Sequence, residues 1–406
     1  DWSSDVCSSD LEYNPFHLGH LYHLQKAKMD TNCDGVICIM SGNFMQRGIP
    51  AIIDKWERAN IAVANGVDLV IELPLVYSIS SAEGFAYGAC SILNSTGVVN
   101  SIYFGSESGN IEELKRISQV LITEPEDFKL NLKLQLDKGA PFHTARKIAL
   151  KNSLHDICCE EIIGSSNNIL AIEYIKSLSK LNSSIIPYTL KRQGANYNDS
   201  ELNNIFSSAT SIRNALKNSG SLKEIENAVS KETFTYLKKL KEEKYNFVFN
   251  DDMFQFVKYK ILTSGETLNR VYDVKEGLDN KIIKEITNSK SIDELILNIK
   301  SKRYTYTRIS RILTSFFLGL EKYDIKKLVH KTPNYIRPLA FNETGSKILK
   351  EIKKKGNIEI LTKLPQKLND EYLEIDLLGT KAYSILNSSI LPYDDYLKSP
   401  TFFRKK

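Results

Sequence analysis

The sequence lacks the features that mark membrane-spanning, disulfide-stabilised and zinc-binding proteins. Its 406 residues include no run of about 18 consecutive apolar residues, so we expect no transmembrane helix and no membrane partner. The six cysteines form no Cys-x-x-Cys pair and no disulfide-like framework, and no metal-binding constellation is visible. We therefore expect a cytoplasmic protein with reduced thiols and no metal held by its own side chains.

The net charge of +5 conceals an asymmetry along the chain. Residues 1–230 carry a net charge of −6, residues 231–406 carry +11, and residues 301–340 alone carry +7. Such a division indicates a basic module that binds a polyanion. Lysines that only solvate helix surfaces would give the same numbers, and charge alone leaves both interpretations open.

Short apolar segments alternate with helical patterns in the first half of the chain. The segments predict buried strands at 34–41, 67–73, 98–104 and 184–190, and the patterns predict helices at 18–30, 54–65, 80–96 and 165–182. This alternation predicts a doubly wound α/β domain with a parallel sheet, whose ligands bind at the carboxyl ends of the strands. We assign it residues 12–219, with a helical insertion at 110–160 and a helix at 210–218. Residues 220–406 read as a mostly helical basic region with little strand signal before 357–362, and a small α/β tail is the alternative for its end.

The first eleven residues do not resemble the buried strand that such a domain should begin with. They include three aspartates and a repeated Ser-Ser-Asp, without apolar alternation. We interpret residues 1–11 as an anomalous segment, an artefact of sequence assembly or reading that replaces the first strand. The sheet is then expected to lack a buried element.

The segment 12–21, Glu-Tyr-Asn-Pro-Phe-His-Leu-Gly-His-Leu, carries the strongest functional signal. The pattern predicts a helix that begins near Leu18, with His17 and His20 on one face because they are three residues apart. A helix N-terminus offers free N–H groups and a positive dipole end, and Gly19 permits close approach of a ligand. We interpret this segment as a triphosphate site. Two ordinary surface histidines are the alternative.

A second phosphate clamp is predicted at Ser207–Arg213, where hydroxyls precede a helix and an arginine lies one turn inside it. Serine and threonine at this position are also ordinary N-caps. Asn167-Asn168 and Lys191-Arg192 are candidate adenosine contacts. Arg47 follows the strand predicted at 34–41 and could bind a phosphate or carboxylate.

The charges of Lys55 and Arg58 are interpreted as solvated groups at a helix start. In the basic region, residues 302–311 interleave cations with aromatic side chains, and Arg308 and Arg311 fall on one helix face. Phosphate contact and base stacking by such a stripe would suit RNA. Cationic side chains that lie over a helical core would give the same pattern.

Several motifs in a fixed order resemble those of the tRNA(Met) cytidine acetate ligase family, in the HIGH-type nucleotidyltransferase superfamily. They are Glu-Tyr-Asn-Pro-Phe-His-Leu-Gly-His (12–20), Met-Ser-Gly-Asn-Phe-Met-Gln-Arg-Gly (40–48), Gly-Val-Asp-Leu-Val-Ile-Glu-Leu-Pro (66–74), Phe-Gly-Ser-Glu (104–107), Asn-Asn-Ile-Leu (167–170), Lys-Arg (191–192) and Tyr-Thr-Tyr-Thr-Arg (304–308). The resemblance runs from Glu12 almost to the C-terminus. It departs from the family at Leu18, where asparagine is usual, and in residues 1–11.

The resemblance implies a HUP-like nucleotidyltransferase domain followed by a tRNA-binding region. It also implies that acetate and ATP give acetyl-adenylate, and that N4 of the wobble cytidine of elongator tRNA(Met) then takes the acetyl group. ATP is the co-substrate, a Mg²⁺ ion on its phosphates is expected, and no protein partner is implied.

Site residues follow from the same motifs. The resemblance implies catalytic roles for His17, His20 and Arg213, and the stripe of cations and aromatic side chains predicts RNA contacts by Arg303, Arg308 and Arg311. The implied ATP site consists of Glu12, Tyr13, Asn14, Pro15, Phe16, His17, Leu18, Gly19, His20, Leu21, Tyr22, His23, Gly105, Asn168, Arg192, Ser207, Thr210 and Ser211, whereas Asp10 and Leu11 lie in the anomalous segment.

Two other functions fit parts of the sequence. A small-molecule adenylyl- or cytidylyltransferase would explain the histidine segment but would leave the basic region without a role. A non-catalytic RNA-binding protein with a retained nucleotide fold would explain the basic region but would not need the histidines.

Overall fold

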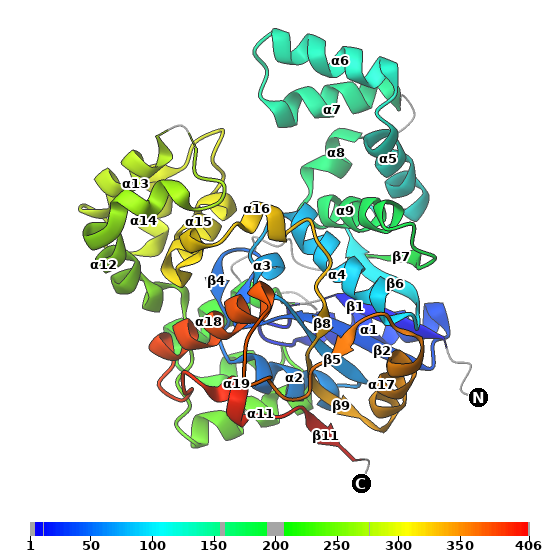
Figure 1. The fold of residues 1–406 in the computed structure, drawn as a ribbon, viewed down its shortest axis with the longest axis vertical. Helices are drawn as coiled ribbons and strands as arrows, with labels where there is room; N and C mark the ends of the chain where they lie inside the picture. Colours follow the sequence, from blue (N-terminus) through cyan, green and yellow to red (C-terminus); the bar gives the residue numbers. More distant parts are fainter. Residues whose placement is uncertain (1–4, 11, 155–158, 193–206, 276, 405–406) are drawn as a thin grey trace.

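The computed structural model describes residues 5–10, 12–154, 159–192, 207–275 and 277–404. Its centre is a seven-stranded sheet in the order β11-β9-β5-β2-β1-β6-β7, with helices on both faces (Figure 1). The strands are β1 (Val6–Asp10), β2 (Gly35–Ser41), β5 (Leu69–Leu73), β6 (Val99–Ser106), β7 (Ile186–Lys191), β9 (Pro338–Asn342) and β11 (Thr401–Phe403). All neighbouring pairs are parallel except β5 and β9.

The α/β part of the fold agrees with the sequence analysis. β2 and β5 are buried along their whole length, as their uninterrupted apolar runs predict. The four predicted strands correspond to β2, β5, β6 and β7. The four predicted helices correspond to α1 (Leu18–Thr31), α2 (Lys55–Ala64), α4 (Ala82–Thr96) and α9 (Ser166–Lys180). The doubly wound parallel arrangement is therefore confirmed.

The expectation that residues 1–11 contribute no strand is wrong. Val6–Asp10 forms β1 in the middle of the sheet, with Cys7 opposite Val36 of β2 and Ser101 of β6. The backbone hydrogen bonds of two flanking strands hold β1 whatever its side chains, and the small side chains of Cys7 and Ser8 fit the tightly packed interior. The polar side chains still fit a buried strand poorly, because the buried hydroxyl of Ser8 has no hydrogen-bond partner among the described residues. The origin of the segment stays a hypothesis.

Helices make up most of the remaining chain. The predicted insertion at 110–160 consists of α5 (Ile111–Thr123), α6 (Glu126–Asp137), α7 (Phe142–Ser153) and α8 (Cys159–Gly164), and the α6–α7 hairpin projects away from the sheet (Figure 1). The predicted helix at 210–218 is α10 (Ala209–Ser219). Further helices are α3 (Leu75–Ser78), α11 (Lys231–Glu242), α12 (Phe254–Ser264), α13 (Leu278–Ile286), α14 (Ile292–Ile299), α15 (Tyr306–Leu318), α16 (Ile325–Leu328), α17 (Glu343–Lys355), α18 (Glu371–Leu386) and α19 (Asp394–Leu397).

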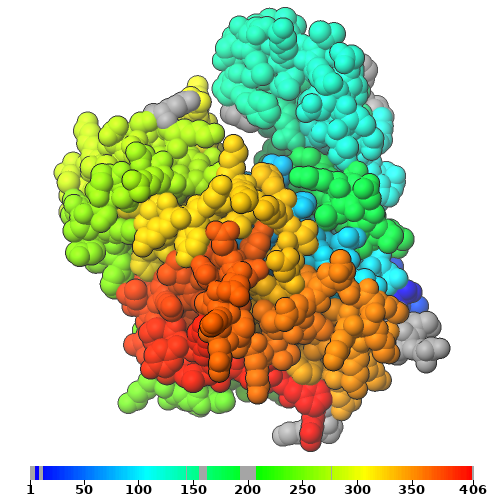
Figure 2. Space-filling model, viewed as in Figure 1, coloured from blue at the N-terminus to red at the C-terminus, as the bar shows by residue number. Residues whose placement is uncertain are grey.

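The C-terminal half adds several strands, of which the one at Glu359–Ile360 falls within the strand signal at 357–362 and the others were not predicted. β9 and β11 extend the sheet beyond β5, so residues 220–406 complete a sheet that residues 12–219 begin. Short strands β8 (Tyr335–Ile336) and β10 (Glu359–Ile360) pair with each other, and β3 (Phe44–Met45) and β4 (Ile49–Pro50) form a small hairpin. The C-terminal segments, orange to red in Figure 2, form the lower central part of the face of the molecule seen there. The domain boundary near residue 219 stays a prediction.

The interpretation of Lys55 and Arg58 as solvated charges is wrong. Both residues are only 1% exposed. Lys55 donates to both carboxylate oxygens of Glu72 and pairs with Asp395. Arg58 donates to the carbonyl oxygens of residues 12, 41, 42 and 53, and so joins the turns that follow β1 and β2. Neither partner set could be read from the local pattern. Among the described helices, none is long and apolar enough to cross a membrane.

Candidate active site

A cavity of about 420 Å³ lies where the parallel strands end. The turn after β1, the loop after β2 and the residue after β7 meet here, as expected for ligands of open parallel sheets. Helices α4, α9, α10 and α15 complete the wall. The lining residues are Glu12, Tyr13, Asn14, His17, His20, Gln46, Arg47, Ile49, Ala82, Phe85, Ser166, Asn167, Ile169, Leu170, Arg192, Ser208, Ala209, Arg213, Thr307 and Arg311.

His17 and His20 are stacked at the beginning of α1, with 3.7 Å between their ring centroids. The Nδ1 atom of His17 accepts a hydrogen bond from the N–H of Gly19, and Nδ1 of His20 accepts one from the N–H of His17. Because both Nδ1 atoms are acceptors, each neutral ring carries its proton on Nε2. The predicted helix start and shared face are confirmed, and the helix cap fixes the tautomer of both rings.

Burial keeps both imidazoles uncharged. It lowers the pKa of His17 to about 3, with smaller contributions from Arg192 and Arg213. Burial also holds the pKa of His20 well below its ordinary value, and His17 and Arg192 lower it further. At neutral pH these residues are therefore N–H donors rather than cations, and the positive charge of the cavity comes from arginines.

Arg213 joins α10 to the turn that carries the histidines. Its Nη1 donates to the carbonyl oxygen of Asn14 at 2.7 Å, and its Nη2 donates to Oγ1 of Thr210 at 3.1 Å. The N-cap of α10 is Ser208, whose Oγ accepts from the N–H of Ser211. The hydroxyl of Ser211 donates to the carbonyl oxygen of Ser208, so both serines serve the cap. Ser208 lines the cavity and Ser207 does not.

The predicted adenosine side is built around Glu107. Its carboxylate accepts from the N–H groups of Asn167 and Asn168 and from Nδ2 of Asn167, and so caps α9. Arg192 donates to Oδ1 of Asn167 at 3.3 Å, and both line the cavity. The Asn168 side chain instead accepts from the N–H of Ser108 and does not line the cavity.

The structure brings together only part of the predicted set. Glu12, Tyr13, Asn14, His17, His20, Arg192 and Arg213 line the cavity, whereas Pro15, Phe16, Leu18, Gly19, Leu21, Tyr22, His23, Gly105, Asn168, Ser207, Thr210 and Ser211 are not among its lining residues. Helical geometry explains part of this, because α1 turns Leu18 and Tyr22 away from the face that carries His17 and His20. Roles for these residues in binding ATP stay predictions. Leu11 lies outside the described residues.

The predicted RNA stripe on α15 is divided. Arg308 pairs with Asp273, with Nη2 2.8 Å from Oδ1 and Nε 2.9 Å from Oδ2, and it lies over the ring of Tyr304. Arg311, one turn later, lines the cavity together with Thr307. Arg303 is exposed. Sequence reasoning missed the place of Arg311, because nothing local shows that α15 packs against the hairpin that ends at Pro50.

The described residues contain no group of three or more histidine, cysteine, aspartate or glutamate side chains that could hold a metal ion. Glu12 is the one carboxylate among the lining residues. It accepts from the N–H of Gln46 at 2.5 Å, and burial raises its pKa, against the opposing effect of this hydrogen bond and of Arg47. The cavity therefore suits an anion, since arginine is the predominant charged residue along its wall.

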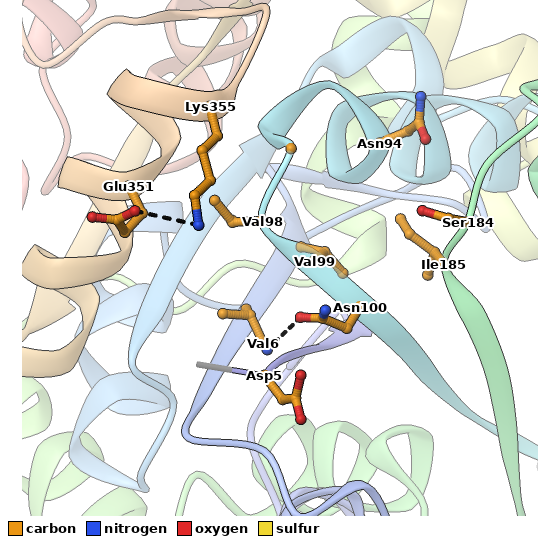
Figure 3. Close-up of a pocket in the computed structure, with 11 residues that line it drawn as sticks. Asp5, Val6, Asn94, Val98, Val99, Asn100, Ser184, Ile185, Glu351 and Lys355 are labelled. Atoms are coloured by element: carbon orange, nitrogen blue, oxygen red, sulfur yellow. Dashed lines mark hydrogen bonds and ion pairs between the residues drawn. The ribbon is translucent and has the colours of Figure 1, made fainter. Parts of the chain in front are cut away.

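A second hollow, of about 380 Å³, lies at the opposite edge of the sheet, where β1 and β6 begin (Figure 3). Asn100 accepts a hydrogen bond there from the N–H of Val6. Among the described residues that line this hollow, Lys355 is the only cation, and it pairs with Glu351. The described lining residues of this hollow include no histidine and no arginine, in contrast to those of the first cavity.

Comparison with known proteins agrees with this geometry. The profile of the HIGH Nucleotidyl Transferase family matches residues 10–395. The tRNA(Met) cytidine acetate ligase of Clostridium novyi is 54% identical over 394 residues, which are 97% of this chain and 98% of that one. The chain belongs to the tRNA(Met) cytidine acetate ligase family.

Other members of this family show the same relationship. The tRNA(Met) cytidine acetate ligase of Clostridium botulinum strain Okra is 49% identical over 405 residues, which are 98% of this chain and 99% of that one. The crystal structure of Thermotoga maritima TmcAL bound with alpha-thio ATP has a TM-score of 0.90 and 34% identity, and covers 99% of this chain and 100% of that one. The apo form of the Thermotoga protein gives a TM-score of 0.91. The family and fold that the motifs imply are therefore confirmed.

Proposed function

We propose that this protein is an ATP-dependent ligase that activates acetate as acetyl-adenylate and transfers the acetyl group to N4 of the wobble cytidine of elongator tRNA(Met). The observation that carries the proposal is the cavity at the strand ends, where two neutral histidines and several arginines surround a space suited to a triphosphate. The 54% identity to a protein of this name and the ATP analogue on the Thermotoga relative support it.

The first step is nucleophilic substitution at phosphorus. One acetate oxygen attacks the α-phosphorus of ATP, a new O–P bond forms, the bond from this phosphorus to the bridging oxygen breaks, and pyrophosphate leaves. The Nε2–H groups of His17 and His20 would donate to phosphate oxygens while negative charge moves onto the leaving group. Arg213 is already fixed by Asn14 and Thr210, so it needs little reorganisation to assist.

The second step is acyl transfer. The N4 amine of cytidine attacks the carbonyl carbon of acetyl-adenylate, a C–N bond forms, the bond between the acyl carbon and the phosphate oxygen breaks, AMP leaves and N4 releases one proton. The carbonyl carbon is already activated, so the protein must mainly place the amine beside it and exclude water.

The proposal also includes a magnesium ion, and the question is which groups would bind it. Within the described part of the chain the donor set does not fit an ion held by protein side chains, because Glu12 is the one carboxylate among the described lining residues and already accepts from Gln46. An ion that arrives with ATP would be bound by phosphate oxygens and water. No step described above depends on side-chain ligands to a metal.

The tRNA is expected to approach from the basic C-terminal half. Arg303 is exposed on this half, and Arg308 is half-buried beside it. Their contact with RNA remains a proposal, as does a location in the cytoplasm, where the tRNA substrate is used.

The test combines the purified protein with ATP, ¹⁴C-acetate and total tRNA, followed by nucleoside analysis of the RNA. Labelled N4-acetylcytidine, formed only when ATP is present, is the expected result. Label confined to a small nucleotide product would indicate a small-molecule adenylyltransferase. Tight tRNA binding without any turnover would indicate a non-catalytic RNA-binding protein.

A further inference from the structure

Arg311 makes fewer close contacts than Arg213, which also lines the cavity, and than Arg308, which lies one turn earlier on α15. Arg213 donates to two protein oxygens near 3 Å, and Arg308 has a bidentate partner in Asp273. The guanidinium of Arg311 has one long hydrogen bond, 3.5 Å from Nη1 to the carbonyl oxygen of Gln46. It has no ion pair within the described part of the chain.

The position of Arg311 is set by a tight backbone contact. The carbonyl oxygen of Gly48 accepts from Oγ of Ser310 at 2.8 Å and from Oγ1 of Thr314 at 2.7 Å. Gly48 has a φ of +74°, and a Cβ atom there would lie 2.4 Å from the backbone nitrogen of Arg311. The hairpin of β3 and β4 is therefore pressed against α15, and Arg311 is held at a fixed place on the cavity wall.

The surroundings of Arg311 favour an anionic ligand. Burial lowers its pKa to about 10, with a smaller contribution from Arg308 and Arg47 and an opposing one from Asp273. It is still a cation at neutral pH, and a partly desolvated cation without a carboxylate partner is unfavourable until an anion arrives. No such cost applies to Arg308, which is already paired.

Part of the wall of the cavity that Arg311 lines is apolar. Ile49 follows Gly48 in the hairpin, and Ala82 and Phe85 come from the first turn of α4. The Nε2 of Gln46 donates to the carbonyl oxygen of Ser80, which links the loop at Arg311 to the start of α4. The same cavity therefore offers a small ligand both a guanidinium and aliphatic or aromatic carbon.

We propose that Arg311 binds the carboxylate of acetate, and that Ile49, Ala82 and Phe85 form the wall that receives its methyl group. The inference rests on the proposed function and assigns the acid substrate to a subsite of the same cavity. A guanidinium can hold one carboxylate oxygen while the other attacks the α-phosphorus of ATP. The apolar wall limits the length of the acid, because a longer chain would have to displace buried carbon.

Acetate-dependent exchange of ³²P-pyrophosphate into ATP measures the first step without tRNA. Arg311→Met is expected to raise the KM for acetate at least 50-fold, and Arg311→Lys is expected to raise it less. The affinity for ATP, measured by calorimetry without acetate, should change less than threefold in both. Arg270→Met, at an exposed arginine of the same helical region, is the matched control and should behave like the unchanged protein.

The apolar wall has its own test. Ile49→Ala enlarges the space beside Arg311, so the ratio of exchange rates with acetate and propionate should fall at least fivefold. This ratio reports specificity and is independent of how much folded protein a variant yields. An unchanged ratio would assign the methyl group to another place.

The outcomes separate the inference from the function on which it rests. No acetate-dependent exchange by the unchanged protein contradicts the proposed function itself. Normal exchange by Arg311→Met overturns the inference and leaves the function intact. Weakened ATP binding with an unchanged KM for acetate would make Arg311 a phosphate contact, and normal exchange with loss of tRNA acetylation would make it an RNA contact. Either result overturns the inference.

Discussion

The Nζ of Lys55 lies 2.8 Å from Oδ1 of Asp395, so the first turn of α2 is joined to a residue close to the end of the chain. Glu72 and Arg337 complete a buried cluster, in which Arg337 lies 3.0 Å from Asp395 and 3.3 Å from Glu72. The N–H of Lys55 also donates to Oδ1 of Asn43, in the turn after β2. The cluster therefore connects the C-terminal segment to a turn close to the site.

Asp395→Asn should lower the free energy of unfolding by about 3–5 kcal/mol, because Lys55 and Arg337 would keep Glu72 as their remaining close anionic partner. Urea denaturation followed by circular dichroism measures the loss. Glu371→Gln changes an exposed carboxylate on α18 and should alter stability by less than about 0.5 kcal/mol. A loss below about 1 kcal/mol in Asp395→Asn would show that the cluster contributes little.

Arg58→Met should destabilise the protein by about 3 kcal/mol or more, because four backbone carbonyl oxygens would lose their common donor in a buried place. Arg58→Lys should recover only part of this, since one ammonium cannot reach all four oxygens. Lys238→Met, on the exposed face of α11, is the control. Equal stability of Arg58→Lys and the unchanged protein would contradict the explanation.

His17→Asn should make the free energy of unfolding depend less on pH between pH 6 and pH 4. The unfolded chain protonates this histidine near pH 6.5 and the folded chain near pH 3, so the unfolded state binds more protons between these values and stability falls with falling pH. Asparagine is a good N-cap and does not titrate. The slope of unfolding free energy against pH from 6 to 4 should decrease by up to about 1.4 kcal/mol per unit. Identical slopes would show that His17 is protonated in the folded protein.

His20→Ala should reduce acetate-dependent pyrophosphate exchange by about 10²–10³-fold, the effect typical of losing one preorganised hydrogen-bond donor in an active site. Its tRNA affinity, measured by filter binding, should stay within twofold. Loss of tRNA binding to the same extent as loss of exchange would contradict a separate role for this residue in ATP chemistry.

Local pattern was sufficient for much of the fold and for the centre of the site. The apolar runs of β2 and β5 and the helix start at Leu18 depend on neighbouring residues, and so do the stacked positions of His17 and His20. The burial of Arg58 and the approach of Arg311 to the cavity depend on contacts between segments far apart in the sequence. At β1 the local pattern was misleading, because pairing with strands on both sides imposes a strand on residues whose side chains do not favour one.

The antiparallel pairing of β9 with β5 also bears on how the chain is made. β5 is synthesised early, but the neighbour that covers its free edge comes from residues 338–342, and β11 comes later still. During translation the growing protein must carry an unpaired, strongly apolar strand edge until most of its length has left the ribosome. Premature termination in the helical half would therefore release chains prone to associate through the unpaired edge of β5.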